Sequence, residues 1–302
     1  MLNITGKKKI YLTISIILLL ISVVSLIVQG FNRDTDFVGG MAVTYTIKSD
    51  FEIKDVEDIV SEALGAKQKA SSVQKSESSD VIIKFGYAND LKTDAERSAF
   101  ATEKIAAITN ALSGKYGEVE LKNQDVVSPS TGIELARSAI WMSVLAALAI
   151  LIYVSFRFEF ISGVAAVVAL VHDILILCGI YSVFQIAIDT NFIAALLTVL
   201  GYSINNTIVV FDRIRENTRH AKKQTYAEIA NVSINQTLGR SINTTITTLI
   251  TLLCVYFMGV LSIKAFTMPI IIGIVVGTYS SIFCTGSIWS MWRDSAVKAK
   301  KA

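Results

Sequence analysis

Six long apolar runs limit what this chain of 302 residues can fold into. Five of them contain no charged side chain, namely residues 10–32, 138–156, 190–211, 241–263 and 265–292. The sixth, residues 160–188, is interrupted only by His172 and Asp173. Each run has about the length that a helix needs to cross roughly 30 Å of hydrocarbon. The pattern predicts an α-helical polytopic membrane protein with six transmembrane helices, and it excludes a single soluble globule.

Basic side chains cluster at one end of these runs, whereas the short loops at the other end carry only Asp189 and Lys264. The basic residues are Lys7, Lys8, Lys9, Arg157, Arg213, Arg215, Arg219, Lys222, Lys223, Arg240, Arg293, Lys298, Lys300 and Lys301. Because basic residues mark the cytoplasmic side of a membrane, both termini are expected there. Residues 1–32 then form the N-terminus and an uncleaved first helix. Residues 138–292 hold the other five helices with a cytoplasmic loop at 212–240, and residues 293–302 form a basic cytoplasmic tail.

Residues 33–137 are then expected outside the cytoplasm as one domain. Residues 34–126 carry 17 acidic and 11 basic side chains, against 8 and 17 in the rest of the chain, and this acidity argues against a nucleic-acid partner. Apolar periodicity predicts strands at 41–47, 81–85 and 118–121 and helices at 54–64 and 94–112. Residues 67–80 are rich in Ser and Lys and are expected to form an exposed loop. The order predicts a small α+β ferredoxin-like domain between the first and second transmembrane helices.

Polar side chains inside the apolar runs are the candidate functional residues, because they are costly in lipid and usually face the bundle interior. His172 and Asp173 form either a proton or ion relay or a structural pair. Ser203 and Asn206 share a helical face with Tyr202, and that face serves either helix packing or a polar pathway. Arg240 either extends its side chain to the cytoplasmic membrane–water interface or joins that pathway. The run of hydroxyl side chains from Thr244 to Thr251 suggests that the same helix has a polar neighbour.

No enzyme motif of the Gly-x-Ser-x-Gly, P-loop or His-Glu-x-x-His type occurs in the sequence, so no catalytic residues, cofactor or metal are expected. The three cysteines, Cys178, Cys254 and Cys284, lie far apart in apolar runs and are expected to pack as small hydrophobic side chains. Gly39 and Gly40 are too few for a phosphate loop. They predict a tight backbone turn between the first helix and the outer domain.

Residues 201–217 closely resemble the signature of the SecF family of bacterial protein-export membrane proteins. The matching side chains are Gly201, Tyr202, Ser203, Asn205, Asn206, Asp212, Arg213, Arg215, Glu216 and Asn217. Asp36, Gly39 and Gly40 resemble the Asp-Phe-x-Gly-Gly motif of the family after its first helix. Residues 129–136, 172–173, 235–244 and 273–282 also fit, so the resemblance covers essentially the whole chain.

The resemblance implies a multi-pass protein of the bacterial plasma membrane that pairs with SecD in a twelve-helix unit. That unit is related to the resistance–nodulation–division transporters. It assists the SecYEG channel and SecA, and it uses a proton or sodium gradient to draw an exported polypeptide outward through the lipid bilayer. Arg240 matches an arginine of the family's ion pathway. Asp212, Arg213 and Arg215 are interpreted as structural support that holds the cytoplasmic loop against the bundle. The alternative is a solvated interface in which Asp212 and Arg215 or Glu216 pair locally.

Asn206 departs from the family pattern, which usually has aspartate there as the proton carrier. An amide cannot titrate, and three explanations stay open: a carboxylate of the partner carries the coupling, Asp173 replaces it, or the chain is uncoupled. Two other functions also stay open. They are a half-unit of a small-molecule or lipid transporter, for which an outer domain of about 100 residues is small, and a purely structural scaffold.

Overall fold

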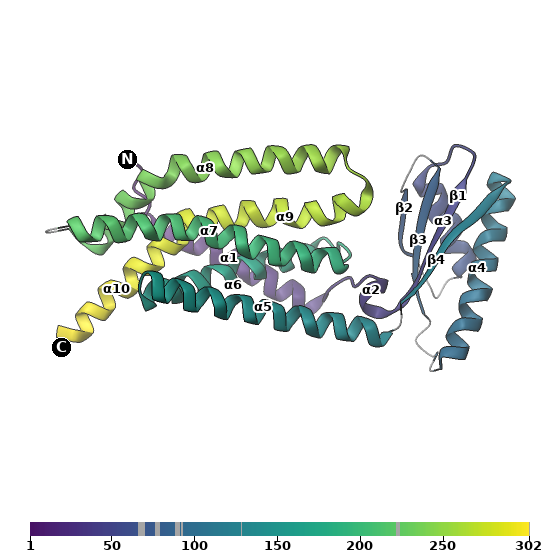
Figure 1. The fold of residues 1–302 in the computed structure, drawn as a ribbon, viewed down its shortest axis with the longest axis horizontal. Coiled ribbons are helices and arrows are strands. Elements are labelled where there is room, and N and C mark those ends of the chain that lie inside the picture. Colours follow the sequence, from purple (N-terminus) through teal and green to yellow (C-terminus); the bar gives the residue numbers. More distant parts are fainter. Residues whose placement is uncertain are drawn as a thin grey trace.

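The computed structural model describes residues 1–65, 70–75, 79–87, 91, 93–127, 129–221 and 224–301. A bundle of long helices carries a small α/β domain at one end, and both chain termini lie at the other end (Figure 1). The bundle contains α1 (Lys8–Val28), α5 (Pro129–Arg157), α6 (Phe160–Val183), α7 (Thr190–His220), α8 (Tyr226–Met258), α9 (Leu261–Tyr279), the π-helical turn η1 (Ser280–Thr285) and α10 (Gly286–Lys301).

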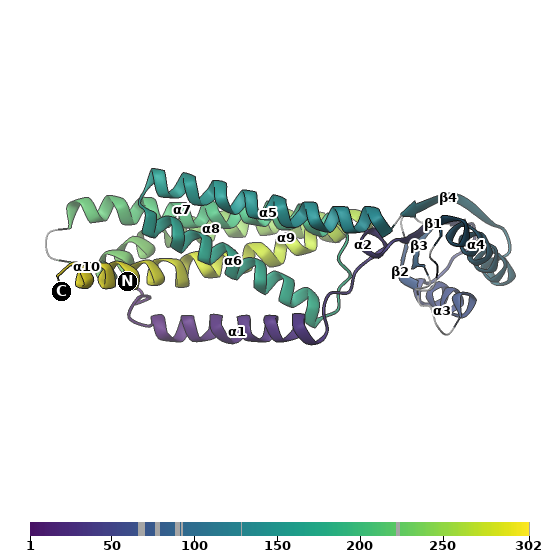
Figure 2. The same ribbon diagram turned by 90° about the horizontal axis from the view of Figure 1, so that it is seen from below.

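Six helical segments are long and apolar enough to cross a membrane, which confirms the predicted fold class. The sixth segment runs through α9, η1 and α10 without a break. The helix α9 contains Pro269, and a departure from α-helical hydrogen bonding follows it at the π-helical turn. Figure 2 shows α1 at the edge of the bundle, where it packs against α6.

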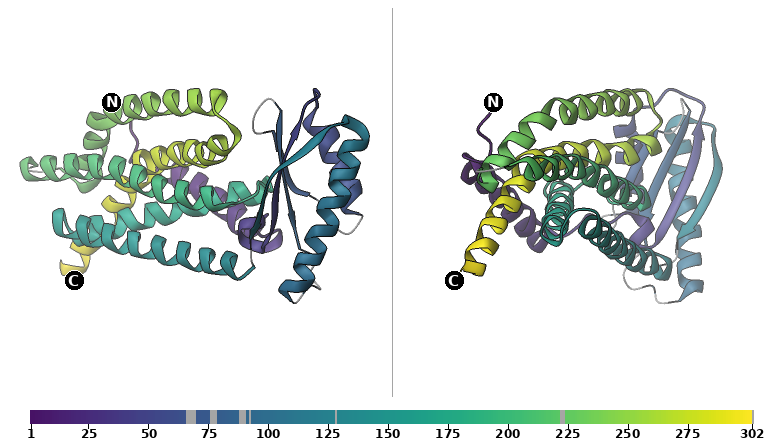
Figure 3. Two further views of the ribbon diagram at one scale, coloured as in Figure 1. Left: turned by 45° about the vertical axis from the view of Figure 1, so that its right-hand side comes forward. Right: turned by 60° about the vertical axis from the view of Figure 1, so that its left-hand side comes forward.

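The α/β domain is an antiparallel sheet of β1 (Gly40–Ile47), β2 (Ala70–Lys75), β3 (Asp80–Gly86) and β4 (Val119–Val127) with α3 (Ile53–Leu64) and α4 (Asp94–Tyr116). The spatial order is β2-β3-β1-β4. Both helices cover the face of the sheet that points away from the bundle (Figures 1 and 3). Val43, Tyr45 and Ile83 of the sheet pack there against Val56 and Ile108 of the helices. This βαββαβ arrangement is the ferredoxin-like fold that the sequence predicts.

Two expectations about loops were wrong. Residues 70–75, placed in an exposed Ser/Lys-rich loop, form the edge strand β2, while residues 66–69 and 76–78 lie outside the described part of the chain. Residues 212–240, expected as a cytoplasmic loop, are mostly helical, because α7 continues to His220 and α8 begins at Tyr226. Thr225 starts α8 with a capping box, in which its hydroxyl accepts from the Glu228 N–H while the Glu228 carboxylate accepts from the Thr225 N–H.

Candidate functional site

A buried carboxylate lies where three membrane helices meet. Asp173 on α6 is 1% exposed, and each of its oxygens has a hydrogen-bond partner. Its Oδ1 lies 2.9 Å from Nδ1 of His172, and its Oδ2 accepts from Ser203 Oγ on α7 at 2.6 Å and from Ser280 Oγ at 2.8 Å. The other ring nitrogen of His172, Nε2, is buried and has no partner among the described residues. The site therefore holds one fully bonded acid and one unused basic atom.

Glycine and the π-helical turn make this meeting point possible. A Cβ on Gly277 would lie 3.0 Å from Ser203 Cβ and 3.4 Å from Asp173 Oδ2, so only glycine lets the sixth span approach α7 this closely. The π-helical turn begins three residues later at Ser280, whose hydroxyl donates to Asp173. π-helical turns inside α-helices are frequent at functional sites.

Asn206 continues the polar contacts one turn further along α7. It is 3% exposed, and its Nδ2 lies 3.4 Å from Thr278 Oγ1, which lies 2.9 Å from Thr245 Oγ1 on α8. Beside it, Thr207 Oγ1 lies 2.9 Å from Ser281 Oγ. We call these neighbouring groups of contacts together the polar seam. Its members are His172, Asp173, Ser203, Asn206, Thr207, Thr245, Thr278, Ser280 and Ser281.

The structure separates some residues that the sequence grouped together. Tyr202 packs against a neighbouring apolar cluster, and its buried hydroxyl has no partner among the described residues. Gly201 has open space at its Cβ position. In the described part of the chain, no three His, Cys, Asp or Glu side chains are grouped as a metal site would require.

Arg240 lies away from the seam. It is exposed on α8 and lines a cavity of about 640 Å³ together with Asn205, Asp212, Arg213 and Glu216. No seam side chain lines that cavity. Among the described residues, the Arg240 guanidinium makes no hydrogen bond or ion pair that ties it to the seam.

The charged end of α7 is tied to its neighbours. Arg213 Nη1 pairs with Glu216 at 2.6 Å, and its Nε donates to Gln236 on α8 at 2.7 Å. Asn217 donates to Ser233 Oγ and to Gln236 Oε1, both at 2.8 Å.

Asp212 does not make the local pair that a solvated interface would have. Its carboxylate lies 3.8 Å from Arg157 at the end of α5, and not against Arg215 or Glu216. Arg215 instead donates to the Arg157 carbonyl at 3.0 Å. The pairing therefore runs between helices, where sequence spacing gives no information.

Asp36 and the two glycines after it join the bundle to the α/β domain. Asp36 lies in the short helix α2 (Thr35–Val38) and accepts from the N–H and the hydroxyl of Thr190, at 3.1 and 2.8 Å, at the start of α7. Gly39 has a φ of +78°, and a Cβ on Gly40 would lie 2.5 Å from the Phe85 carbonyl oxygen. The tight turn predicted at this pair is confirmed.

A buried ion pair strengthens the same junction. Asp34, which caps α2, pairs with Lys84 of β3 at 2.6 Å. Burial alone would lower the pKa of Lys84, but its hydrogen bond to Asp34 and the charges of Asp36 and Asp189 raise this pKa overall. Lys84 therefore stays charged and holds the domain against the end of the bundle.

Comparison with known proteins identifies the family. Residues 107–295 match the family described as "Protein export membrane protein SecD/SecF, C-terminal". The chain belongs to the SecD/SecF family. The protein translocase subunit SecF of Sebaldella termitidis is 37% identical over 93% of this chain and 89% of that protein, and SecF of Haemophilus influenzae is 34% identical over 91% and 81%. The family expected from residues 201–217 is confirmed, and the chain is a multi-pass protein of the bacterial membrane.

The solved structures agree with this assignment. The crystal structure of SecDF from Thermus thermophilus, described as a translocon-associated membrane protein, superposes with a TM-score of 0.79 at 32% identity, over 97% of this chain and 39% of that one. A SecDF structure in a super-membrane-facing form gives a TM-score of 0.73. The SecDF relatives carry more than this chain, which covers 40% of the Thermus thermophilus SecDF sequence.

Proposed function

We propose that this chain is an accessory subunit of the Sec protein translocase and works with a SecD-type subunit to promote protein export across the bacterial plasma membrane. The observation that carries the proposal is the match to SecF proteins over nearly the whole chain, with the same fold as one part of SecDF. SecDF extends well beyond the 39% that this chain covers, and this supports a SecD-type partner for it. SecYEG, SecA and the exported polypeptide are the further partners.

The proposed orientation has both termini in the cytoplasm and residues 33–137 outside. Basic residues at the bundle end that carries the termini support it, since such residues are retained on the cytoplasmic side. The α/β domain then lies where an exported chain emerges. The cytoplasmic end is stiffened by Asp212, Arg213, Arg215 and Asn217, which tie α5, α7 and α8 together.

The polar seam is the proposed contribution of this chain to a proton or sodium pathway. Asp173 is its carboxylate, and His172 offers a free buried nitrogen that can take a proton. Asn206 lies beside them but cannot titrate. Arg240 lies on the exposed face of α8, where it is available to a partner. A gradient can therefore act either through Asp173 or through a carboxylate of the SecD-type subunit.

The alternative, a half-unit of a resistance–nodulation–division transporter for small molecules or lipids, is not favoured. The relatives are named as protein translocase subunits. The outer domain also has one four-stranded sheet whose helices cover a single face, without a second copy to form a binding cleft in the described part of the chain.

Export kinetics in cells depleted of SecF test this proposal. The cells would express this chain with its own SecD-type partner, and the maturation rate of a secretory precursor would be measured. Restored export supports the accessory role. A chain that inserts and binds its partner but restores nothing would contradict it, and efflux of small molecules would then be assayed.

The variant Asp173→Asn separates the two proposed coupling routes. It keeps the shape of the side chain and one acceptor oxygen for the two serine hydroxyls, but it removes the charge and replaces the other oxygen with an amide donor. Lost export with intact partner binding assigns the coupling to Asp173. Unchanged export assigns it to the partner.

A further inference from the structure

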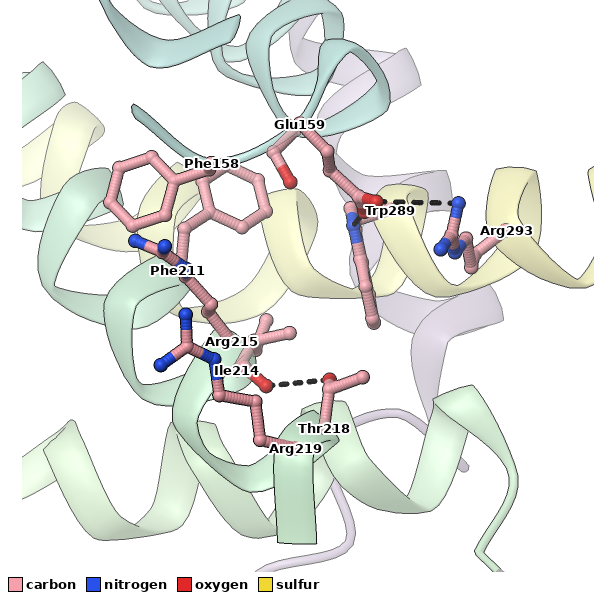
Figure 4. A pocket seen from close by; sticks show the side chains of 10 residues that line it. Phe158, Glu159, Phe211, Ile214, Arg215, Thr218, Arg219, Trp289 and Arg293 are labelled. Carbon is pink, nitrogen blue, oxygen red and sulfur yellow. Dashed lines mark hydrogen bonds and ion pairs between the residues drawn. The ribbon is translucent and has the colours of Figure 1, made fainter. Parts of the chain in front are cut away.

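A small basic pocket lies at the bundle end that carries both termini, away from the polar seam. It has a volume of about 150 Å³, enough for roughly five water molecules. Its lining comes from the start of α6, the last turns of α7 and α10. Figure 4 shows Arg215 and Arg219 on one side of the pocket, Arg293 on the other and Trp289 between them.

The cations of this pocket are not neutralised by its one acid. Glu159 accepts from Trp289 Nε1 at 2.8 Å and pairs with Arg293 at 3.3 Å, so its carboxylate is already used. Arg219 makes no side-chain hydrogen bond or ion pair with another described residue and lines the pocket. With three arginines and one glutamate, the lining carries a net charge of about +2.

Nearby acids do not remove this excess. Arg215 and Arg219 also line a neighbouring cavity with Asp212 and Glu216. Those two carboxylates have their own cations, since Glu216 pairs with Arg213 at 2.6 Å and Asp212 lies 3.8 Å from Arg157.

The start of α6 and several side-chain donors lie at this pocket. The helix α6 begins at Phe160 without a side-chain cap, because Glu159 at the cap position turns to Trp289 and Arg293. Uncapped N–H groups at the start of a long helix favour an anion. Ser162 in the first turn lines the pocket, and the Nε of Arg293 is buried without a partner among the described residues. A helix start, a hydroxyl and three guanidinium groups are the donors by which proteins hold phosphate.

The depth of the pocket points to a lipid. It lies where α5 ends at Arg157 and α6 begins at Phe160, the border between the apolar runs and the charged end. Phe156 and Phe160 flank the lining residues Phe158 and Glu159 in the sequence, are 95% and 69% exposed, and belong to the apolar runs, as lipid-facing side chains do. Basic pockets between transmembrane helices at this level suit anionic lipid headgroups. We propose that this pocket binds the phosphate of an anionic phospholipid, with Arg215, Arg219 and Arg293 as its cations and Phe156 and Phe160 beside the acyl chains.

Lipid titration of the purified full chain in detergent tests the proposal. The probes are dioctanoyl phosphatidylglycerol, dioctanoyl phosphatidylcholine and inorganic phosphate, and bound equivalents are counted by native mass spectrometry. The variant is Arg219→Gln, which removes a guanidinium that makes no internal contact and so leaves the fold intact. The matched control is Lys264→Gln, which removes one positive charge at the start of α9, at the opposite end of the bundle.

We expect one saturable phosphatidylglycerol site, about tenfold weaker in Arg219→Gln and unchanged in Lys264→Gln. The affinity of Arg219→Lys for phosphatidylglycerol should lie between those of the wild type and Arg219→Gln, because lysine keeps the positive charge but loses the planar guanidinium group. Equal binding by the glutamine variants, or by the two lipids, would overturn the proposal. Inorganic phosphate binding as tightly as phosphatidylglycerol would assign the pocket to a free anion. Loss of the lipid on addition of the SecD-type subunit would assign it to that partner, and either result overturns the lipid assignment.

Discussion

Gly277→Ala should disrupt the polar seam by steric contact alone. The added methyl would lie 3.0 Å from Ser203 Cβ, whereas ordinary carbon contacts are about 3.5–4.0 Å. The sixth span and α7 must then separate by a few tenths of an ångström. Because Ser280 moves with the sixth span, its 2.8 Å hydrogen bond to Asp173 lengthens beyond the normal range. Overpacking of this kind costs about 1–3 kcal/mol of the free energy of unfolding.

Gly201→Ala is the matched control for this prediction. Gly201 also lies within a membrane helix, but its Cβ position has open space, so alanine there should be neutral or stabilise by up to about 1 kcal/mol. Both variants of the full chain would be unfolded by heat and by SDS titration in the same detergent, without the partner. The clash argument is refuted when Gly277→Ala unfolds at the same midpoint as Gly201→Ala.

Three further predictions concern titratable positions. Asp173→Asn should unfold within about 1 kcal/mol of the wild type, whereas Asp173→Ala, which removes the side chain that three groups contact, should lose about 2 kcal/mol in the same thermal assay. Equal losses would contradict the bonding described for this carboxylate. Asn206→Asp should leave folding, membrane insertion and co-purification of the SecD-type subunit intact, and failure of any of these would show that the seam does not tolerate a carboxylate there. Hydrogen bonds from Lys122 and Thr46 lower the pKa of Asp80 in the folded protein. The ionised Asp80 therefore stabilises the fold fully above its unfolded pKa of about 3.9, and this contribution to the free energy of unfolding disappears as the pH falls through the lower folded pKa. Unfolding midpoints between about pH 5 and pH 2 should therefore fall less in Asp80→Asn, and parallel curves would count against this role.

The sequence predicts the larger architecture because that architecture depends on composition. Apolar runs predict the membrane helices. The alternation of apolar and polar residues predicts β1 and β3, which are central strands with one buried face. The strand β2 escapes this reasoning because Ala70–Lys75 is polar and pairs only with β3. An edge strand of this kind is defined by its neighbour's unpaired backbone groups and not by its own side chains.

The candidate site is only half predictable for a similar reason. Asp173 and Asn206 stand out in apolar runs because their burial is costly. Ser280 and Thr278 do not, since hydroxyls in membrane helices usually bond to their own backbone. The run on α8 illustrates this, because Thr244, Thr247, Thr248 and Thr251 all donate to carbonyls within their own helix, whereas Thr245 meets a polar neighbour in Thr278 of α9.

The position of the charge within the seam decides how a gradient can act on this chain. The contact of Asn206 with Thr278 and Thr245 joins α7, α9 and α8 through neutral groups, so a change of protonation cannot alter it directly. Asp173, in contrast, accepts from α7 and from the π-helical turn, and a proton on Oδ2 would disturb both bonds at once. Under the proposed coupling through Asp173, the first change would be a movement of α6 against α7 and the sixth span. Because α7 begins at the junction held by Asp36, such a movement has a direct route to the α/β domain.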